Sequence, residues 1–145
     1  MRYGECDPQG IVFNANYLLY FDVVFTELWR ASVGPWQEMV AKGFDAVVAE
    51  ARLRFRSPAR FDDQLQLRAQ VTRLGTSSIT TSIDVVREDE LLVAGVLRHV
   101  CVATRSLTDD KPAKAAIPDW IRHGLRRFAL DGAQQEAAPG SAPEP

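Results

Sequence analysis

The sequence predicts an α+β fold in which an antiparallel β-sheet wraps around one long central helix. A segment near the start of the chain is apolar around most of a helical circumference, so other elements must cover it. Four later segments alternate apolar and polar residues with a period of two, and short links join them, which favours an antiparallel meander. Because one face of that meander is apolar, we expect it to pack on the helix.

The long helix is predicted over residues 16–32. Its apolar positions recur at helical spacing: Leu18, Phe21, Phe25 and Leu28, broadened by Tyr20, Val24 and Trp29. Asn14 or Asn16 is expected to cap its start, and Gly34 followed by Pro35 is expected to end it.

The strands are predicted at residues 47–55, 65–71, 79–85 and 91–106. In the first strand, alternation predicts two faces: Val47, Ala49, Ala51, Leu53 and Phe55 on one, and Val48, Glu50, Arg52, Arg54 and Arg56 on the other. Pro58 ends this strand, and Gly75-Thr76-Ser77 forms a later turn.

The chain length predicts one domain, residues 1–130, which is long enough to bury a core. A short amphipathic helix is expected after Pro118. Residues 131–145 consist mostly of Ala, Gln, Glu, Pro and Gly, and we expect a disordered C-terminal tail there because nothing in it can be buried.

Composition narrows the possible classes of function. The net charge of −2 argues against a general nucleic-acid binder. Cys6 and Cys101 are too few for a disulfide scaffold and lack metal-ligand spacing, which favours a reduced, cytoplasmic protein without a metal site. The longest apolar stretch, residues 17–29, is interrupted by polar residues such as Asp22, so neither a membrane span nor a signal peptide is expected.

The segment with the clearest chemical meaning is residues 3–17, YGECDPQGIVFNANY. Asp7 lies in a loop with Pro8 and Gly10, seven residues before the helix start near Asn14. The first turn of a helix has unpaired N–H groups that could stabilise an oxyanion, and a nearby carboxylate could attack an acyl carbon or deprotonate water. An Asp before Pro is also a common turn residue, so this pattern alone leaves both interpretations open.

This segment closely resembles the signature of the 4-hydroxybenzoyl-CoA thioesterase-like branch of the hotdog-fold acyl-CoA thioesterases. The order of later features is similar as well: the helix end at Gly34, the strand end at residues 55–58, residues 62–65 and the turn at residues 75–78. The resemblance covers about residues 2–128 and implies a hotdog fold, an acyl-CoA substrate, no cofactor beyond the substrate's own coenzyme A, and a homodimer or homotetramer with sites at subunit interfaces.

The resemblance also implies residue roles. Asp7 matches the catalytic carboxylate, Gly10 the glycine that lets the loop approach the thioester, and Asn14 the position whose backbone amide polarises the thioester carbonyl. Many relatives carry His where this chain has Asn14. Substrate-binding candidates follow by position: Phe13, Tyr17, Arg60, Thr76 and Ser77.

Several other residues are weighed against plainer interpretations. Cys6 and His99 are expected to be packed residues, and His123 a surface residue. The arginines 52, 54 and 56 share one strand face, which could be a solvated face, a contact between dimers or a site for CoA phosphates.

We therefore expect a thioesterase that hydrolyses an aryl- or acyl-CoA to a free acid and CoA, with Asp7 as nucleophile or general base. Two alternatives stay open at this point: a non-hydrolytic acyl-binding hotdog protein, and a thioesterase acting on acyl carrier protein. A dehydratase is disfavoured because neither His99 nor His123 is suitably placed.

Overall fold

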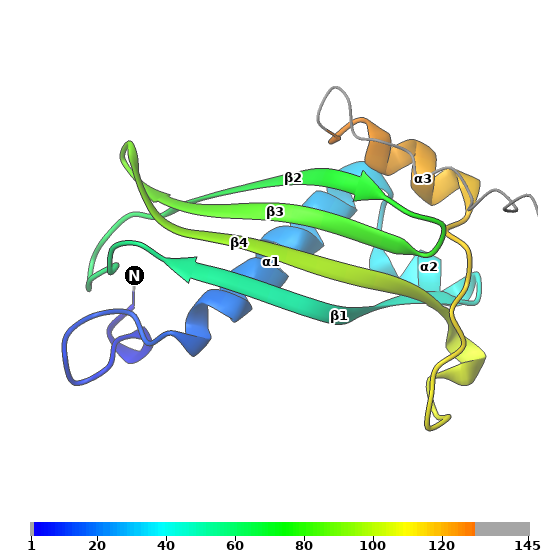
Figure 1. Cartoon of the computed structure of the whole chain (residues 1–145), viewed down its shortest axis with the longest axis horizontal. Coiled ribbons are helices and arrows are strands. Elements are labelled where there is room, and N and C mark those ends of the chain that lie inside the picture. Colours follow the sequence, from blue (N-terminus) through cyan, green and yellow to red (C-terminus); the bar gives the residue numbers. More distant parts are fainter. Residues whose placement is uncertain (1, 130–145) are drawn as a thin grey trace, which may run out of the picture.

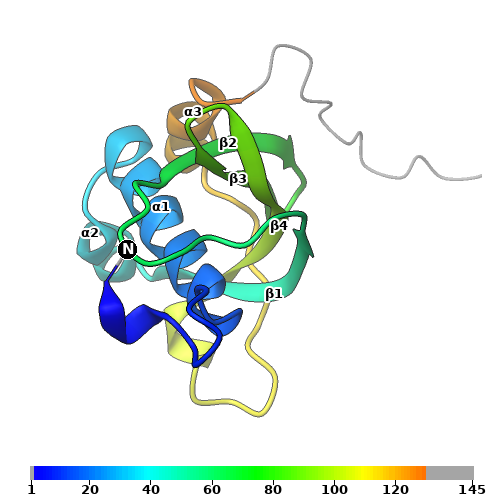
Figure 2. The same cartoon turned by 90° about the vertical axis from the view of Figure 1, so that its left-hand side faces the viewer.

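A curved four-stranded sheet covers one side of a long helix in the computed structural model, which describes residues 2–129 (Figure 1). The helix is α1 (Ala15–Ser32), and the strands are β1 (Phe44–Phe55), β2 (Gln66–Leu74), β3 (Ser78–Arg87) and β4 (Glu90–Ala103). All neighbouring strands are antiparallel, in the order β1-β4-β3-β2. Figure 2 shows α1 on the concave side of the sheet, which confirms the predicted α+β arrangement.

Shorter elements close the ends of this arrangement. They are η1 (Tyr3–Glu5), α2 (Trp36–Ala41), η2 (Thr104–Ser106) and α3 (Asp119–Arg126). The helix expected after Pro118 is α3, whose Ile121 and Leu125 are fully buried. Helix α2 was not predicted from the sequence, and the last strand, predicted to reach residue 106, ends at Ala103 and is followed by η2.

Helix α1 buries most of the predicted apolar stripe. Phe21, Phe25, Leu28 and Trp29 are buried as predicted, but at the start of the helix Tyr17 is buried and Leu18 is 45% exposed. Residues 17 and 18 point about 100° apart on a helix, and at this turn Tyr17 takes the buried side. The prediction for Leu18 is therefore wrong.

Gly95 of β4 permits the close approach of α1 to the sheet. A Cβ atom built at this position would lie 2.0 Å from Cε2 of Phe21, so the ring occupies the space that any side chain would need. Phe21 belongs to the half of the core near the start of α1, and Phe25 and Trp29 belong to the other half, next to α3.

Strand β1 forms an open edge of the sheet, because β4 is its single strand neighbour. The strand contains a bulge: Val48 pairs with His99 and Glu50 pairs with Arg98, which leaves Ala49 between them. The bulge reverses the alternation, so Val48 shares the inner face with Leu53, and the predicted grouping of Val48 with the arginines is wrong.

Two further predictions concern the C-terminal tail and the absence of a membrane span. The C-terminal tail predicted for residues 131–145 lies outside the described residues. Within residues 2–129, no helix has the length and apolar character that crossing a membrane requires.

Candidate active site

Residues 6–12 form a small loop that folds back on itself beside the start of α1. Cys6 and Val12 make an isolated antiparallel bridge, and the Asp7 backbone N–H donates to Ile11 O at 2.8 Å. The Gly10 N–H donates to Asp7 O at 2.9 Å, and Gly10 has φ +76°, which an L side chain rarely adopts. The glycine therefore allows the tight turn that carries Asp7.

The Asp7 carboxylate is half-buried and held on one side. Its Oδ1 accepts the backbone N–H of Gln9 at 2.8 Å, an interaction typical of Asp in turns. Among the described residues, the other carboxylate oxygen has no hydrogen-bond donor. One oxygen thus orients the group, while the second is available to water or to a substrate.

Asn14 occupies the N-cap position of α1, but its side chain makes no capping hydrogen bond. The Asn16 side chain is used differently from the prediction too, because Nδ2 donates to Glu5 O at 2.7 Å. No acceptor for the Asn14 backbone N–H lies within residues 2–129. This leaves a free donor at the positive end of the α1 dipole, which is the property that an oxyanion site needs.

A pocket of about 460 Å³ brings these groups together. It is lined by the loop through Asp7, Ile11, Phe13 and Asn14, by α1 through Tyr17, and by the end of β1 through residues 55–58. The Tyr17 ring meets the Phe55 ring edge to face, with 5.5 Å between centroids. A carboxylate, a free backbone donor and an aromatic wall therefore share one pocket.

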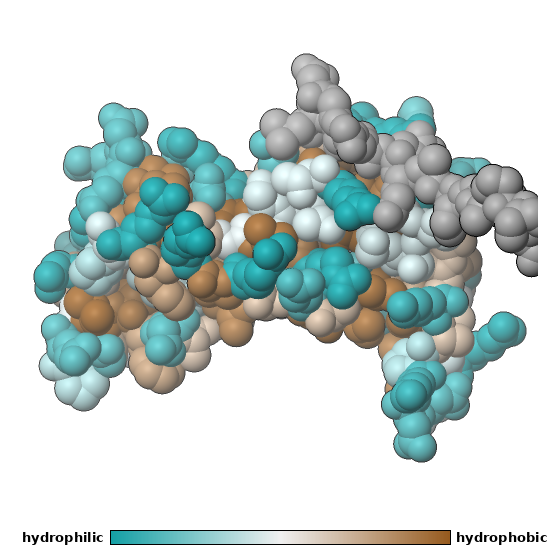
Figure 3. Space-filling view, viewed as in Figure 1, coloured by the Kyte–Doolittle hydropathy of each residue, from teal (hydrophilic) through white to brown (hydrophobic). Residues whose placement is uncertain are grey.

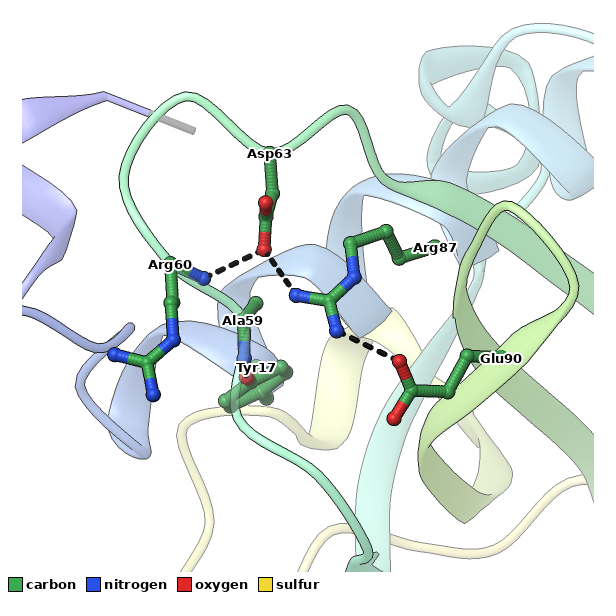
Figure 4. A network of polar contacts seen from close by, with 6 residues as sticks. All are labelled: Tyr17, Ala59, Arg60, Asp63, Arg87 and Glu90. Atoms are coloured by element: carbon green, nitrogen blue, oxygen red, sulfur yellow. Dashed lines mark hydrogen bonds and ion pairs between the residues drawn. The ribbon is translucent and has the colours of Figure 1, made fainter.

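The segment after β1 is held in place by a polar network (Figure 4). Asp63 Oδ2 accepts the Arg60 backbone N–H at 2.7 Å and also pairs with Arg87 Nη1 at 2.7 Å, while Arg87 Nη2 reaches Glu90. The Arg60 N–H bond, and after it Arg87, lower the pKa of Asp63. The Ala59 N–H donates to the Tyr17 hydroxyl at 3.3 Å, which joins this segment to α1.

This held segment supports the Asp7 loop. Val12 N–H donates to Ala59 O at 2.8 Å, and Ile11 and Arg60 form an antiparallel bridge. Backbone hydrogen bonds therefore hold the loop on both sides, at η1 and at residues 59–60. These two sets of contacts together fix the position of Asp7.

The predicted site residues fall into two groups in a single chain. Asp7, Phe13, Asn14 and Tyr17 line the pocket, and Gly10 shapes the loop. Arg60 lies behind the loop, paired with Ile11. Thr76 and Ser77 lie in the β2–β3 turn at the opposite end of the sheet, where Thr76 borders a separate hollow beside α3 (Figure 1).

The remaining candidates lie away from the pocket. His99 is 2% exposed and stacks on Phe25 with 3.7 Å between ring centroids, and His123 is on the exposed side of α3. Glu50 pairs with Arg52 and Arg98 on the outer face of the sheet. Within the described part of the chain, no group of three or more His, Cys, Asp or Glu side chains could hold a metal ion.

The end of β1 contributes to the pocket, which the sequence did not predict. Phe55, Arg56 and Ser57 line the pocket although about fifty residues separate them from Asp7 in the sequence. A strand that ends at Pro58 gives the only local signal, and it does not reveal that the strand ends beside the loop.

Comparison with known proteins agrees with this geometry. Residues 9–94 match the model of the thioesterase superfamily. The acyl-CoA thioester hydrolase YbgC of Escherichia coli O157:H7 is 31% identical over 101 residues, which cover 69% of this chain and 75% of the relative. The 1,4-dihydroxy-2-naphthoyl-CoA hydrolase of a Synechococcus strain is 23% identical over 136 residues, 90% of this chain and 88% of that one.

Solved structures share the fold. The protein TT1821 from Thermus thermophilus superposes with a TM-score of 0.76 at 27% identity, covering 88% of this chain and 94% of the other. The BH1999 gentisyl-coenzyme A thioesterase superposes with a TM-score of 0.75 at 22% identity, covering 86% and 94%. The predicted hotdog fold and the predicted thioesterase family are confirmed: this chain belongs to the thioesterase superfamily.

Proposed function

We propose that this protein hydrolyses acyl-CoA thioesters to a free acid and CoA, with Asp7 as the reacting carboxylate. The observation that carries the proposal is the pocket that joins Asp7 to the unpaired backbone N–H of Asn14. A thioester carbonyl placed between them would have its carbon near the carboxylate and its oxygen near the helix dipole. The E. coli relative that is named an acyl-CoA thioester hydrolase supports this choice of substrate.

Two routes are compatible with the free oxygen of Asp7. As a general base, Asp7 takes a proton from water, the water oxygen attacks the acyl carbon, the C–S bond breaks, and the CoA thiolate leaves and is protonated. As a nucleophile, Asp7 itself forms a mixed anhydride while the C–S bond breaks, and water then hydrolyses the anhydride. Both routes consume one water molecule and need no metal or organic cofactor.

A single turnover in ¹⁸O-labelled water tests for the anhydride route. Label found in Asp7 by peptide mass spectrometry identifies that route, because it arises only when water attacks the Asp7 carbonyl of the anhydride. Label in the product acid alone is expected both for general-base hydrolysis and for water attack on the acyl carbon of the anhydride.

The pocket wall favours an aryl or medium-length acyl group. Phe13, Tyr17 and Phe55 present aromatic surface next to Asp7, and a planar ring could stack against it. Two similar proteins are named for substrates with aromatic acyl groups, gentisyl-CoA and 1,4-dihydroxy-2-naphthoyl-CoA, which agrees with this preference.

We also propose a cytoplasmic homodimer formed through β1. This strand is a twelve-residue edge whose apolar Val48 and Phe55 are 52% and 54% exposed, and such an edge is a template for pairing with another strand. Antiparallel pairing of β1 with its copy reverses the partner, so the end of the partner that carries Thr76 and Ser77 would approach the Asp7 end of this chain.

The dimer is tested by light scattering of the parent and of Val48→Lys. The lysine would place an unpaired charge on the inner side of the new strand pair, so we expect the variant to be a monomer. A variant that stays dimeric would show that the two chains meet elsewhere.

The activity is tested by thiol release from a panel of aryl-, short-, medium- and long-chain acyl-CoAs. We expect turnover of at least one thioester and a loss on the order of 10²–10⁴-fold in Asp7→Asn, with circular dichroism showing that the variant is folded. If the parent cleaves nothing but binds acyl-CoA, the protein is an acyl-binding member of the fold. If it prefers acyl carrier protein thioesters, the substrate assignment changes while the role of Asp7 stands.

A further inference from the structure

A row of arginines on the outer face of the sheet leads to the mouth of the pocket. Arg52 and Arg54 of β1 and Arg56, the residue that follows the strand, lie at every second position on the side away from α1, and they border a hollow of about 700 Å³. Figure 3 views this face and shows hydrophilic areas between hydrophobic ones. The floor is made of short side chains, Ser82, Ala94 and Val96, which leave space between the arginines and the middle of the sheet.

Two of the three arginines are unpaired. Arg52 Nε lies 3.1 Å from Glu50, and Glu50 also pairs with Arg98. Arg54 and Arg56 are exposed and have no ion pair or side-chain hydrogen bond with any described residue. One carboxylate, Asp84, also borders the hollow, so the arginines outnumber the acids there.

Arg56 connects the hollow to the active-site pocket, because it lines both. Its backbone is fixed at the strand end, where the Arg56 N–H donates to Leu92 O at 2.8 Å. At about 3.3 Å per strand residue, the row extends roughly 13 Å from Arg56 to Arg52. A ligand held at Asp7 with a long anionic extension could therefore follow β1 without crossing the protein.

We propose that Arg54 and Arg56 bind the phosphate groups of the CoA portion of the substrate. The proposal rests on the acyl-CoA thioesterase function and adds a subsite to it. The thioester would lie at Asp7, the pantetheine arm would pass Arg56, and the pyrophosphate and 3′-phosphate would lie in the hollow on the outer face. Guanidinium groups bind phosphate through paired N–H donors, and unpaired arginines give up no existing ion pair when they do so.

The test compares two substrates that carry the same acyl group, one on CoA and one on pantetheine, which has no phosphate. In the double variant Arg54→Gln/Arg56→Gln we expect KM for the CoA thioester to rise about five- to thirtyfold. The single variant Arg54→Gln lies in the hollow and outside the active-site pocket, so it should show a smaller rise in KM for the CoA thioester. In this variant we expect kcat/KM for the pantetheine thioester to stay within about twofold of the parent, because that substrate has no phosphate contact to lose. Added salt should raise KM for the CoA thioester more in the parent than in the double variant.

Arg68→Gln is the matched control. Arg68 lies on β2 at the far side of the same sheet and hydrogen-bonds to Gln66, so its removal changes the net charge by the same amount as Arg54→Gln without touching the hollow. Equal changes in KM in Arg68→Gln and Arg54→Gln would reduce the effect to overall charge and overturn the proposal. The proposal would also be overturned if Arg54→Gln lowered kcat/KM equally for the CoA thioester and the pantetheine thioester, because that result would show damage to the pocket itself.

A direct measurement separates this proposal from the proposed function. Adenosine 3′,5′-bisphosphate contains the nucleotide phosphates without the thioester, and its binding can be measured by calorimetry. If the parent hydrolyses no thioester yet binds this nucleotide, and the double variant does not, the phosphate site stands and the hydrolytic function fails. If the parent hydrolyses acyl-CoA and the double variant matches it in every constant, the function stands and the phosphate site fails.

Discussion

His99 is expected to make the protein lose stability in mild acid. Its side chain is 2% exposed and stacks on Phe25, and its Nδ1 has no hydrogen-bond partner among the described residues. Burial lowers the pKa of His99 from 6.5 to about 4, because a charged imidazolium would lose its hydration there. The folded protein therefore holds this side chain neutral over a range in which the unfolded chain would protonate it.

The size and sign of the effect follow from the two pKa values. Between pH 6.5 and about 4 the unfolded state binds a proton that the folded state does not, so the free energy of unfolding falls as the pH falls. A difference of 6.5 − 4, or 2.5 pKa units, at roughly 1.4 kcal/mol per unit corresponds to about 3–4 kcal/mol. This stability is fully present above pH 6.5 and is lost by about pH 4.

Urea unfolding at a series of pH values across this window provides the assay. The parent is compared with His99→Leu, which cannot be protonated, and with His123→Gln, which removes an exposed histidine as a control. Carboxylates such as Asp63 titrate in all three proteins, so the difference between parent and His99→Leu isolates His99. That difference should change by about 3–4 kcal/mol across the window. A constant difference would refute the reasoning, because it would mean that His99 takes up a proton as readily in the folded state as in the unfolded state.

Three further outcomes follow from local geometry. Gly95→Ala should destabilise the fold by about 1–3 kcal/mol or more in thermal unfolding, because its Cβ collides with the α1 ring above it, whereas Gly4→Ala, which meets nothing within 4 Å, should be nearly neutral. Tyr17→Phe should cost about 1–3 kcal/mol in urea unfolding by leaving the buried Ala59 N–H unpaired, and no loss would show that this bond is dispensable. Gly10→Ala should cost about 1–2 kcal/mol and lower kcat, because φ +76° disfavours a side chain in the loop; unchanged kcat would separate loop geometry from catalysis.

The elements with strong periodicity could be predicted from the sequence. The α1 pattern covers five turns, and its predicted range differs from the structure by one residue. Strands β2 and β3 also appear at the predicted places. β2 begins one residue later and ends three residues later than predicted, and β3 begins one residue earlier and ends two residues later. Repeated apolar positions predict such elements well because each turn or strand pair adds to the same signal.

Local departures from the pattern could not be predicted. In β1, Val47 and Val48 are both apolar, so the sequence alone does not say which of them faces the helix. The bulge at Ala49 decides this through the pairing with β4, which is a long-range contact. The same limitation applies to Leu18, because Tyr17 beside it competes for the inner face.

The predicted site was incomplete in one chain for a physical reason. The motif places Asp7 and Asn14 together because only a short loop separates them, but residues 55–58 join them through the curvature of the sheet. Thr76 and Ser77 stay at the other end, beside α3. In the proposed dimer the antiparallel pairing of β1 would return them to the Asp7 end of the partner. The dimer would then explain both the open edge of β1 and the incomplete pocket: each chain would supply the reacting groups of one site, and its far end would complete the other.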